Sequence, residues 1–281
     1  MSSTSSGPRP GARAAASVRV HLRRAAGPAV RRLRREVQWR RSGTWRRLGR
    51  ADADACPEEV ARHATPLFRE LPGVDQQLQR NKAVNLALAV AQLDGILIGP
   101  GESFSFWRHV GHPAARRGYL EGLVLDHGRL TAAVGGGMCQ LTNLIYWMTL
   151  HTPLTVSERW RHSYDVFPDA GRTQPFGSGA TCAWPSLDLQ LTNSTTASFR
   201  LGLRVTGTHL EGSWTSDRPP VHTYEVYESD HLFTHDGPGV FQRHNVIRRR
   251  VRDLLGREVA DELVTANQAL LRYQPFLESG R

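Results

Sequence analysis

The pattern of apolar and polar residues divides this chain into a helical first part and a strand-rich second part. Apolar residues recur at helical spacing in four segments, which predict helices over about residues 57–70, 78–93, 138–151 and 259–271. Pro57 suits the first turn of the first helix, and the Asp94-Gly95 pair suits the end of the second. Three of the four predicted helices thus precede residue 152.

Short or alternating apolar runs predict strands elsewhere. Residues 96–98 and 103–106 are short candidates, and residues 122–134 predict a hairpin that turns at Asp126-His127-Gly128. Further strands are predicted over about residues 156–164, 180–184, 187–191, 199–205 and 222–228. Helices followed by a strand-rich half predict an α+β fold, in which a largely antiparallel sheet packs around a central, cysteine-bearing helix.

Charge is distributed unevenly and indicates a domain boundary. Residues 1–50 hold fourteen arginines, no lysine and a single acid, Glu36, so they carry +13 in a chain whose total is +10. Residues 51–281 therefore carry −3. Because the first residues are rich in Ser, Pro and Gly, we expect an Arg-rich extension over 1–50, disordered or partly helical, followed by an α+β domain over 51–281.

The arginine-rich extension also predicts a partner. Between residues 18 and 50 its arginines interleave with the apolar residues Val30, Leu33, Val37, Trp39 and Trp45. A basic amphipathic helix of this composition is suited to an anionic membrane surface or to nucleic acid. The alternative is a solvated extension whose arginines bind no defined partner.

Composition excludes several classes of site. Cys56, Cys139 and Cys182 form neither a disulfide framework nor C-x-x-C pairs, and this usage suits a reducing compartment. The histidines lack carboxylates at a metal-binding offset, and no phosphate-binding glycine loop occurs, so we expect no metal and no other cofactor. Neither an apolar run of about 18 residues nor a clean signal segment is present. The prediction is a cytoplasmic protein, either free in the cytoplasm or peripheral to the inner face of the membrane.

The strongest candidate for chemistry is Cys139, in the sequence Val134-Gly-Gly-Gly-Met-Cys-Gln140. It lies at the start of the third predicted helix, where free backbone N–H groups and the helix dipole favour a thiolate. The glycines Gly135, Gly136 and Gly137 permit a tight turn and let a substrate lie against the main chain. The alternative is that Cys139 is a small buried residue and that the glycines only form a turn.

A thiol nucleophile needs a base and a group that orients it. His162 is the first plausible base downstream, because the strand predicted over 156–164 closely follows the cysteine helix. Asp165 or Asp188 can orient the imidazole, and strand parity favours Asp188. The structural alternatives are a packed core histidine and a solvated strand aspartate.

Three further residues complete the candidate site. Gln140 or the Cys139 N–H can stabilise an oxyanion. Asn143, one helical turn after Cys139, and the loop aromatic Trp107 are candidates for substrate binding. Gln140 is otherwise only the start of the helix, and large aromatics such as Trp107 more often fill cores.

A series of motifs recurs in order along the chain: Asn81-Lys82, Asn85-Leu86, Pro100-Gly-Glu-Ser-Phe-Ser-Phe-Trp107, Val110-Gly111, Gly118-Tyr119, Gly135-Gly-Gly-Met-Cys-Gln140, Leu144-Ile-Tyr146, Glu158-Arg159, His162-Ser163, Pro175-Phe-Gly-Ser-Gly-Ala-Thr181 and Asp188. The series resembles the VanW family, the vancomycin B-type resistance protein W group, from about residue 60 to about residue 275. Cys139 and His162 both fit the family pattern. Many relatives carry an aspartate where this chain has Gly179, so no role of that aspartate is transferred.

The resemblance implies an accessory role in glycopeptide resistance or cell-envelope metabolism, without an assigned biochemical activity. Two hypotheses follow. In the first, the protein is a thiol hydrolase or acyl transferase, in which Cys139 attacks a carbonyl of a cell-wall precursor peptide or another small peptide and His162 moves the proton. In the second, it is a non-catalytic, envelope-associated binding or accessory module. The sequence leaves open whether the chain is an enzyme.

Overall fold

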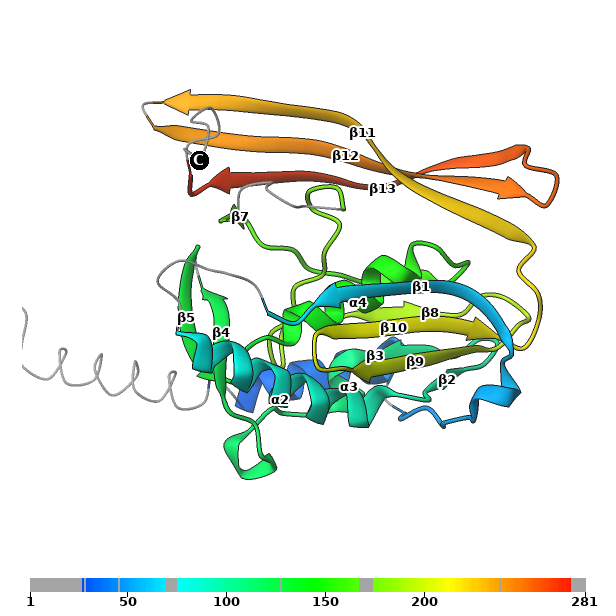
Figure 1. Ribbon diagram of the computed structural model, residues 1–281, viewed down its shortest axis with the longest axis horizontal. Helices are drawn as coiled ribbons and strands as arrows, with labels where there is room; N and C mark the ends of the chain where they lie inside the picture. The colour runs from blue at the N-terminus through cyan, green and yellow to red at the C-terminus, as the bar shows by residue number, and fades with distance from the viewer. Residues whose placement is uncertain are drawn as a thin grey trace, which may run out of the picture.

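The computed structural model describes residues 27, 29–44, 46–68, 75–126, 128–166, 174–237 and 239–273. Its helical segments are residues 29–41, η1 (Ala53–Ala55), α2 (Gln76–Leu93), α3 (Phe106–Val110), η2 (Ala115–Arg117) and α4 (Met138–Thr149). Its strands are β1 (Glu58–Pro66), β2 (Leu97–Ile98), β3 (Ser103–Ser105), β4 (Glu121–Asp126), β5 (Arg129–Val134), β6 (Thr155–Glu158), β7 (Tyr164–Asp165), β8 (Gln190–Thr192), β9 (Phe199–Val205), β10 (His209–Ser216), β11 (His222–Gly237), β12 (Val240–Asp253) and β13 (Glu258–Leu271). The predicted α+β class is confirmed (Figure 1).

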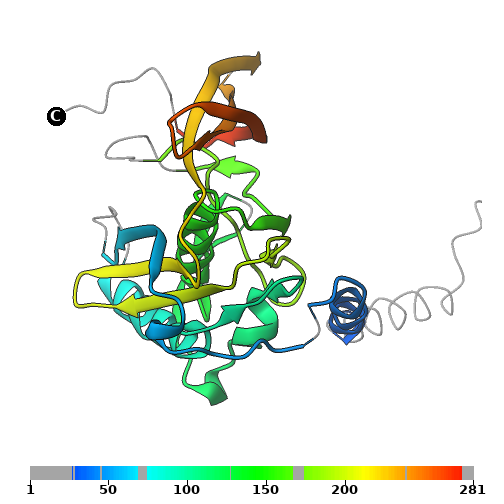
Figure 2. The ribbon, with the colours of Figure 1, turned by 90° about the vertical axis from the view of Figure 1, so that its right-hand side faces the viewer.

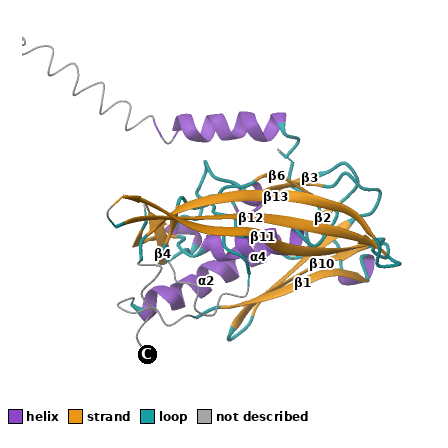
Figure 3. Cartoon of the chain, turned by 90° about the horizontal axis from the view of Figure 1, so that it is seen from above, coloured by secondary structure: helices purple, strands orange, loops and turns teal. Residues whose placement is uncertain are grey.

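The strands of the described residues form mostly antiparallel sheets. β1, β10, β9 and β2 are neighbours in one sheet, β3, β8 and β6 in a second, and β4 and β5 form a hairpin. The long strands β11, β12 and β13 form another sheet, to which the short β7 adds in parallel at β13. Figures 1 and 2 show this long sheet standing apart from the β1-β10-β9-β2 sheet, and Figure 3 shows its strands from above.

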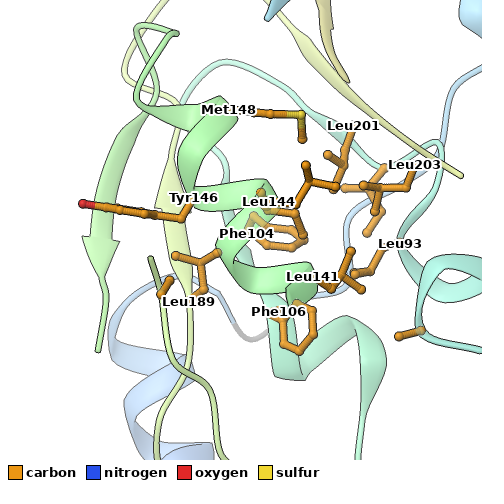
Figure 4. Close-up of a cluster of buried hydrophobic side chains, with 14 of the residues drawn as sticks. Leu93, Phe104, Phe106, Leu141, Leu144, Tyr146, Met148, Leu189, Leu201 and Leu203 are labelled. Carbon is orange, nitrogen blue, oxygen red and sulfur yellow. The ribbon is translucent and has the colours of Figure 1, made fainter. Parts of the chain in front are cut away.

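α4 supplies the centre of the core. Its buried stripe is the one that helical spacing predicts: Leu141, Leu144, Ile145 and Met148. Figure 4 shows Leu141, Leu144 and Met148 of this stripe on the side of α4 that faces leucines of β9 and the phenylalanines of β3 and α3. Gly212 of β10 allows the close approach, because a Cβ there would lie 2.7 Å from the Met148 methyl carbon. The central cysteine-bearing helix is therefore confirmed.

Several other predicted elements are also confirmed. α2 begins where the Asp75 side chain accepts a hydrogen bond from the Gln77 N–H at 2.8 Å, and it ends before Gly95, whose φ is 81°. The hairpin predicted over 122–134 is β4 and β5, and the strand predicted over 199–205 is β9. Local capping and turn residues determine these elements, so the sequence reveals them.

The helix predicted over 57–70 is wrong, because residues Glu58–Pro66 form β1. β1 pairs with β10 in antiparallel register, from Glu58 opposite Ser216 to Pro66 opposite His209. Ala61 is the one buried residue of the strand. The segment therefore has too few buried apolar residues to form the packed face of a helix. Pairing with β10 overrides the weak local preference.

The helix predicted over 259–271 is also wrong, because this segment is β13. β13 pairs with β12, and its acids lie across from the arginine cluster: Asp261 binds Arg248 at 3.2 Å and Glu262 binds Arg249. The acids of this segment, which would be solvent-exposed on a helix, therefore form cross-strand ion pairs with the arginines of β12. The strand predicted over 222–228 is only the first part of β11.

The strand predicted over 156–164 is interrupted. β6 ends at Glu158, Trp160 makes an isolated bridge to Thr181, and residues 161–163 are irregular. The strand predicted over 180–184 consists only of isolated bridges, and β8 begins at Gln190. Strand parity therefore does not apply to His162.

The helix over 29–41 docks on the domain through two inward side chains. Arg35 is 3% exposed, and its guanidinium donates to both carboxylate oxygens of Glu158, at 2.7 and 2.9 Å. Trp39 is buried in the core, and its Nε1 donates to Asp188 at 3.0 Å. The start of the extension, residues 1–26, and Trp45 lie outside the described residues. None of the helices in the described part of the chain is long and apolar enough to cross a membrane.

Candidate functional site

Cys139 is the second residue of α4, and it is half-buried beside the core. The helix begins after Gly137, whose φ of 98° is left-handed, and no side chain caps its N-terminus. The first N–H groups of a helix have no partner within it, and its dipole is positive at this end. The predicted environment of Cys139, at the start of a helix, is therefore present.

Two other side chains surround the Cys139 sulfur. Its Sγ lies 3.7 Å from the Cys182 carbonyl oxygen, and the side chains of Cys182 and His162 are the neighbours that lower the pKa of the thiol. The hydrogen bond with the Cys182 thiol is the largest cause that holds the pKa of Cys139 well below its ordinary value, and the His162 ring acts in the same direction against burial. Cys139 is thus the thiol that ionises first.

Cys182 behaves in the opposite way. Burial and the neighbouring Cys139 raise the pKa of the Cys182 thiol well above its ordinary value. The pair therefore combines a thiol of lowered pKa at Cys139 with a thiol of raised pKa at Cys182. The sequence did not indicate this residue as part of a site, although it directly follows the Pro175–Thr181 motif.

His162 lies in the irregular segment between β6 and β7 and is half-buried. Backbone hydrogen bonds on both sides fix the segment: the Thr181 N–H donates to the Trp160 carbonyl at 2.8 Å, and the Leu270 N–H to the Ser163 carbonyl at 3.0 Å. The first of these bonds also places His162 near Cys182. Two segments, 160–163 and 181–182, thus meet over the N-terminus of α4.

Arg159 and Asn143 hold the segment that precedes Cys182. The Arg159 guanidinium stacks 4.8 Å from the Tyr146 ring centre and donates to the carbonyls of Gly177 and Gly179. The Asn143 carbonyl oxygen accepts from the Ala180 N–H at 2.6 Å. A Cβ at Gly179 would lie 2.7 Å from that oxygen, so glycine at this position leaves room for the Asn143 amide. Asn143 is exposed, and its predicted role in substrate binding stays a prediction.

The glycines before Cys139 are explained by packing. Gly135 and Gly137 have φ of 78° and 98°, and side chains there would overlap Pro113 and Lys82. Gly136 packs against the backbone of Gly122 in β4, and its carbonyl accepts from Asn85 at 3.0 Å. This close packing fixes the start of α4. The additional role of the glycines in substrate binding stays a prediction.

The contact between Gly136 and Gly122 predicts the effect of a single methyl group. Gly136→Ala should destabilise the protein by about 1–3 kcal/mol, because the new Cβ would overlap a backbone carbonyl that cannot turn aside. Unfolding in guanidinium chloride measures the change. Gly207→Ala is the matched control, since nothing lies within 4 Å of its Cβ, and it should leave the free energy of unfolding nearly unchanged. Equal stability of the two variants would contradict this packing.

The Asp188 carboxylate has hydrogen-bond partners other than His162, and its predicted role in orienting His162 stays a prediction. Its carboxylate is buried and accepts hydrogen bonds from Trp39, Ser105, Trp107, Leu189 and Gln190, at distances between 2.5 and 3.3 Å. Burial raises the pKa of Asp188, and these bonds oppose that rise. In the described residues no hydrogen bond joins Asp188 to His162. The contacts of Asp188 instead join the 29–41 helix to β3, α3 and β8.

Gln140 and Trp107 also point to other parts of the molecule. The Gln140 amide donates to Thr65 and Pro66 of β1, both at 2.9 Å, so it anchors the first turn of α4 to that strand. Trp107 is buried, and its Nε1 donates to the Leu187 carbonyl at 2.7 Å. Their predicted roles in oxyanion and substrate binding stay predictions. The close group at the helix N-terminus consists of Cys139, His162 and Cys182.

Comparison with known proteins extends the family resemblance. Residues 81–215 match the family described as VanW like protein. The chain is 33% identical over 213 residues to the Vancomycin B-type resistance protein VanW of Enterococcus faecalis, covering 76% of this chain and 77% of that protein. It is 27% identical over 114 residues to the uncharacterised protein YoaR of Bacillus subtilis, covering 41% of this chain and 36% of that protein. The comparison with solved structures found no significant match. The motifs that surround Cys139, together with this similarity over most of both chains, show that the protein belongs to the VanW family.

Proposed function

We propose that this protein is a thiol hydrolase or acyl transferase, with Cys139 as nucleophile and His162 as its acid–base partner. One observation carries the proposal: the Cys139 thiol lies at the uncapped N-terminus of α4, where the neighbouring Cys182 and His162 side chains hold its pKa well below its ordinary value. A nucleophilic thiol needs a base in contact and an electropositive environment. The helix N-terminus and the neighbouring His162 support this assignment for Cys139.

The reaction follows from these contacts. Cys139 transfers its proton to His162, and the thiolate attacks the carbonyl carbon of an amide. The tetrahedral oxyanion forms beside the first N–H groups of α4, which stabilise its charge. His162 then gives its proton to the leaving amine, and a thioester remains on Cys139. Water or a second amine attacks the thioester while His162 takes the proton of the attacking group, and Cys139 is regenerated.

In this proposal Cys182 and Thr142 support the nucleophile, and Asp188 is structural. Cys182 helps to keep the pKa of Cys139 low, and the Thr142 hydroxyl donates to the Ala180 carbonyl at 2.6 Å, which holds the segment that leads to Cys182 against α4. Asp188 takes no part in the reaction, because its carboxylate is engaged elsewhere. The proposed catalytic unit is therefore a Cys–His pair.

The substrate class comes from the relative. The Enterococcus faecalis protein is named for vancomycin B-type resistance, and the family resemblance implies a role in glycopeptide resistance or cell-envelope metabolism. We therefore propose that the carbonyl attacked by Cys139 belongs to a cell-wall precursor peptide and that the protein has an accessory role in glycopeptide resistance. A thiol acyl transferase suits such a substrate, because the peptide is built of amide bonds.

Alkylation of Cys139 across pH tests the proposed pair. The rate with iodoacetamide should reach its half-maximum below about 8.5, the ordinary pKa of a free cysteine. His162→Gln and Cys182→Ala should each move that midpoint upward, because each removes a group that lowers the pKa of Cys139. Peptide mapping separates Cys139 from Cys56, a buried thiol whose pKa burial raises and which serves as an internal control. A midpoint at or above 8.5 that neither variant moves would contradict the proposal.

A further inference from the structure

The helix over residues 29–41 buries one face against the domain, and its aliphatic side chains lie on the opposite, exposed face. Arg35 and Trp39 point into the domain, where they bind Glu158 and Asp188. The apolar side chains are exposed instead: Val30 by 43%, Leu33 by 66% and Val37 by 41%. At about 100° per residue, the centres of the two groups lie about 170° apart around the helix. The apolar stripe therefore points directly away from the domain.

Arginines border this stripe. Around the same helix, Arg34 and Arg41 lie on one side of the apolar stripe and Arg40 on the other, and all three are exposed. Arg31 and Arg32 are exposed closer to the domain. Arg35 is the exception, since Glu158 neutralises it. The outward face thus combines three apolar side chains with a border of unpaired positive charge.

The positive surface continues onto the domain beside the helix. Burial lowers the pKa of His112, and the positive charges of Arg116, Arg117 and Arg32 lower it further. The positive charge of Arg32 thus acts on the same histidine as Arg116 and Arg117, which belong to η2. Arg116 and Arg117 are exposed or bound to the backbone: the Arg117 guanidinium donates to the His112 carbonyl at 2.8 Å. The basic area is larger than the helix alone.

We propose that this face binds an anionic lipid bilayer surface, with the helix lying parallel to the membrane. Val30, Leu33 and Val37 would enter the boundary between headgroups and acyl chains, and the bordering arginines would contact lipid phosphates. The inward contacts of Arg35 and Trp39 hold the helix in this orientation. The inference is independent of the chemistry proposed for Cys139.

Charge and polarity favour this partner over two others. A second copy of the chain would bring the same exposed arginines face to face, and like charges repel. Nucleic acid would satisfy the arginines but would leave the apolar stripe against a polar groove or backbone. A bilayer with anionic headgroups satisfies both components of the face. The chain contacts it along a surface, which needs no membrane-spanning helix.

Vesicle flotation of the full chain tests the proposal. The wild type should bind vesicles of phosphatidylcholine with phosphatidylglycerol and should bind vesicles of phosphatidylcholine alone much more weakly. Leu33→Glu should reduce binding to the anionic vesicles by about tenfold or more, because a buried leucine is replaced by a charge that the lipid repels. Leu255→Glu is the matched control, since Leu255 is 77% exposed at the turn between β12 and β13, and it should bind like the wild type.

Both variants keep residues 1–26 unchanged, so that segment does not account for a difference between them. Leu33 is exposed, so Leu33→Glu should unfold at the wild-type temperature. Equal vesicle binding by Leu33→Glu and the wild type would overturn the proposal. Binding to duplex DNA with no binding to anionic vesicles would overturn it as well and would assign the arginines to nucleic acid.

Discussion

Cys139→Ala is expected to abolish the proposed acyl transfer, with a loss of kcat/KM on the order of 1,000-fold or more. Alanine removes the only atom that forms the thioester, and no other thiol replaces it, because Cys182 is buried and its pKa is raised. Release of amines from a panel of synthetic cell-wall precursor peptides measures turnover. The intact mass of the protein shows whether an acyl group accumulates on Cys139.

The controls separate chemistry from folding. Cys56→Ala removes a buried thiol near the Ser198 carbonyl, away from the site, and should keep full turnover. His162→Gln should retain the fold and lose most of the activity, since it removes the proton carrier but keeps a polar side chain. For the proposed accessory role, a host strain that carries Cys139→Ala at normal protein levels should grow less well in vancomycin than the strain with the wild-type protein. Unchanged growth together with unchanged turnover would remove the catalytic proposal and leave the non-catalytic accessory module.

Arg35→Ala should destabilise the whole protein by about 3–5 kcal/mol. Arg35 is buried, and its guanidinium binds both oxygens of Glu158 as well as the carbonyls of Pro185 and Ser186. Its removal leaves the Glu158 carboxylate, which is 10% exposed, without its main partner. The cost of an unpaired buried charge exceeds the loss of a surface ion pair, which is at most about 1 kcal/mol.

Arg34→Ala provides the comparison, because it lies in the same helix with an exposed side chain and should change stability by about 0.5 kcal/mol or less. Denaturant unfolding followed by tryptophan fluorescence measures both variants, since Trp39 becomes exposed if the helix leaves the domain. Equal stability of Arg35→Ala and Arg34→Ala would show that the helix does not dock in solution. A single transition that moves to lower denaturant in Arg35→Ala would show that helix and domain unfold together.

Local signals explain why part of the fold is visible in the sequence. The Asp94-Gly95 ending of α2, the turn of the β4–β5 hairpin and the apolar stripe of α4 each depend on residues close in sequence. The α+β class follows from their order. These predictions are confirmed because the caps, turns and buried faces that favour each element locally are also compatible with its tertiary packing.

Distant pairing explains the errors. β1 gains its partner more than 140 residues later, at β10, and β13 depends on the charges of β12. Neither segment contains the information that it will be a strand, because the hydrogen bonds and ion pairs come from elsewhere in the chain. The same holds for Asp188, whose polar strand position suggested a solvated or catalytic residue. Its partners, which include Trp39 and Ser105, bury it beneath the first helix.

The sequence by itself determined the family, the central helix and the position of Cys139 at that helix's N-terminus, because glycines, caps and helical spacing act over short distances. Only the tertiary structure decided what surrounds the sulfur. It brings together residues 139, 162 and 182 through backbone hydrogen bonds between segments that are separate in sequence, and it assigns the carboxylate of Asp188 to the core. The physical reason is that a thiol's acidity depends on neighbours in space, and the fold sets those neighbours.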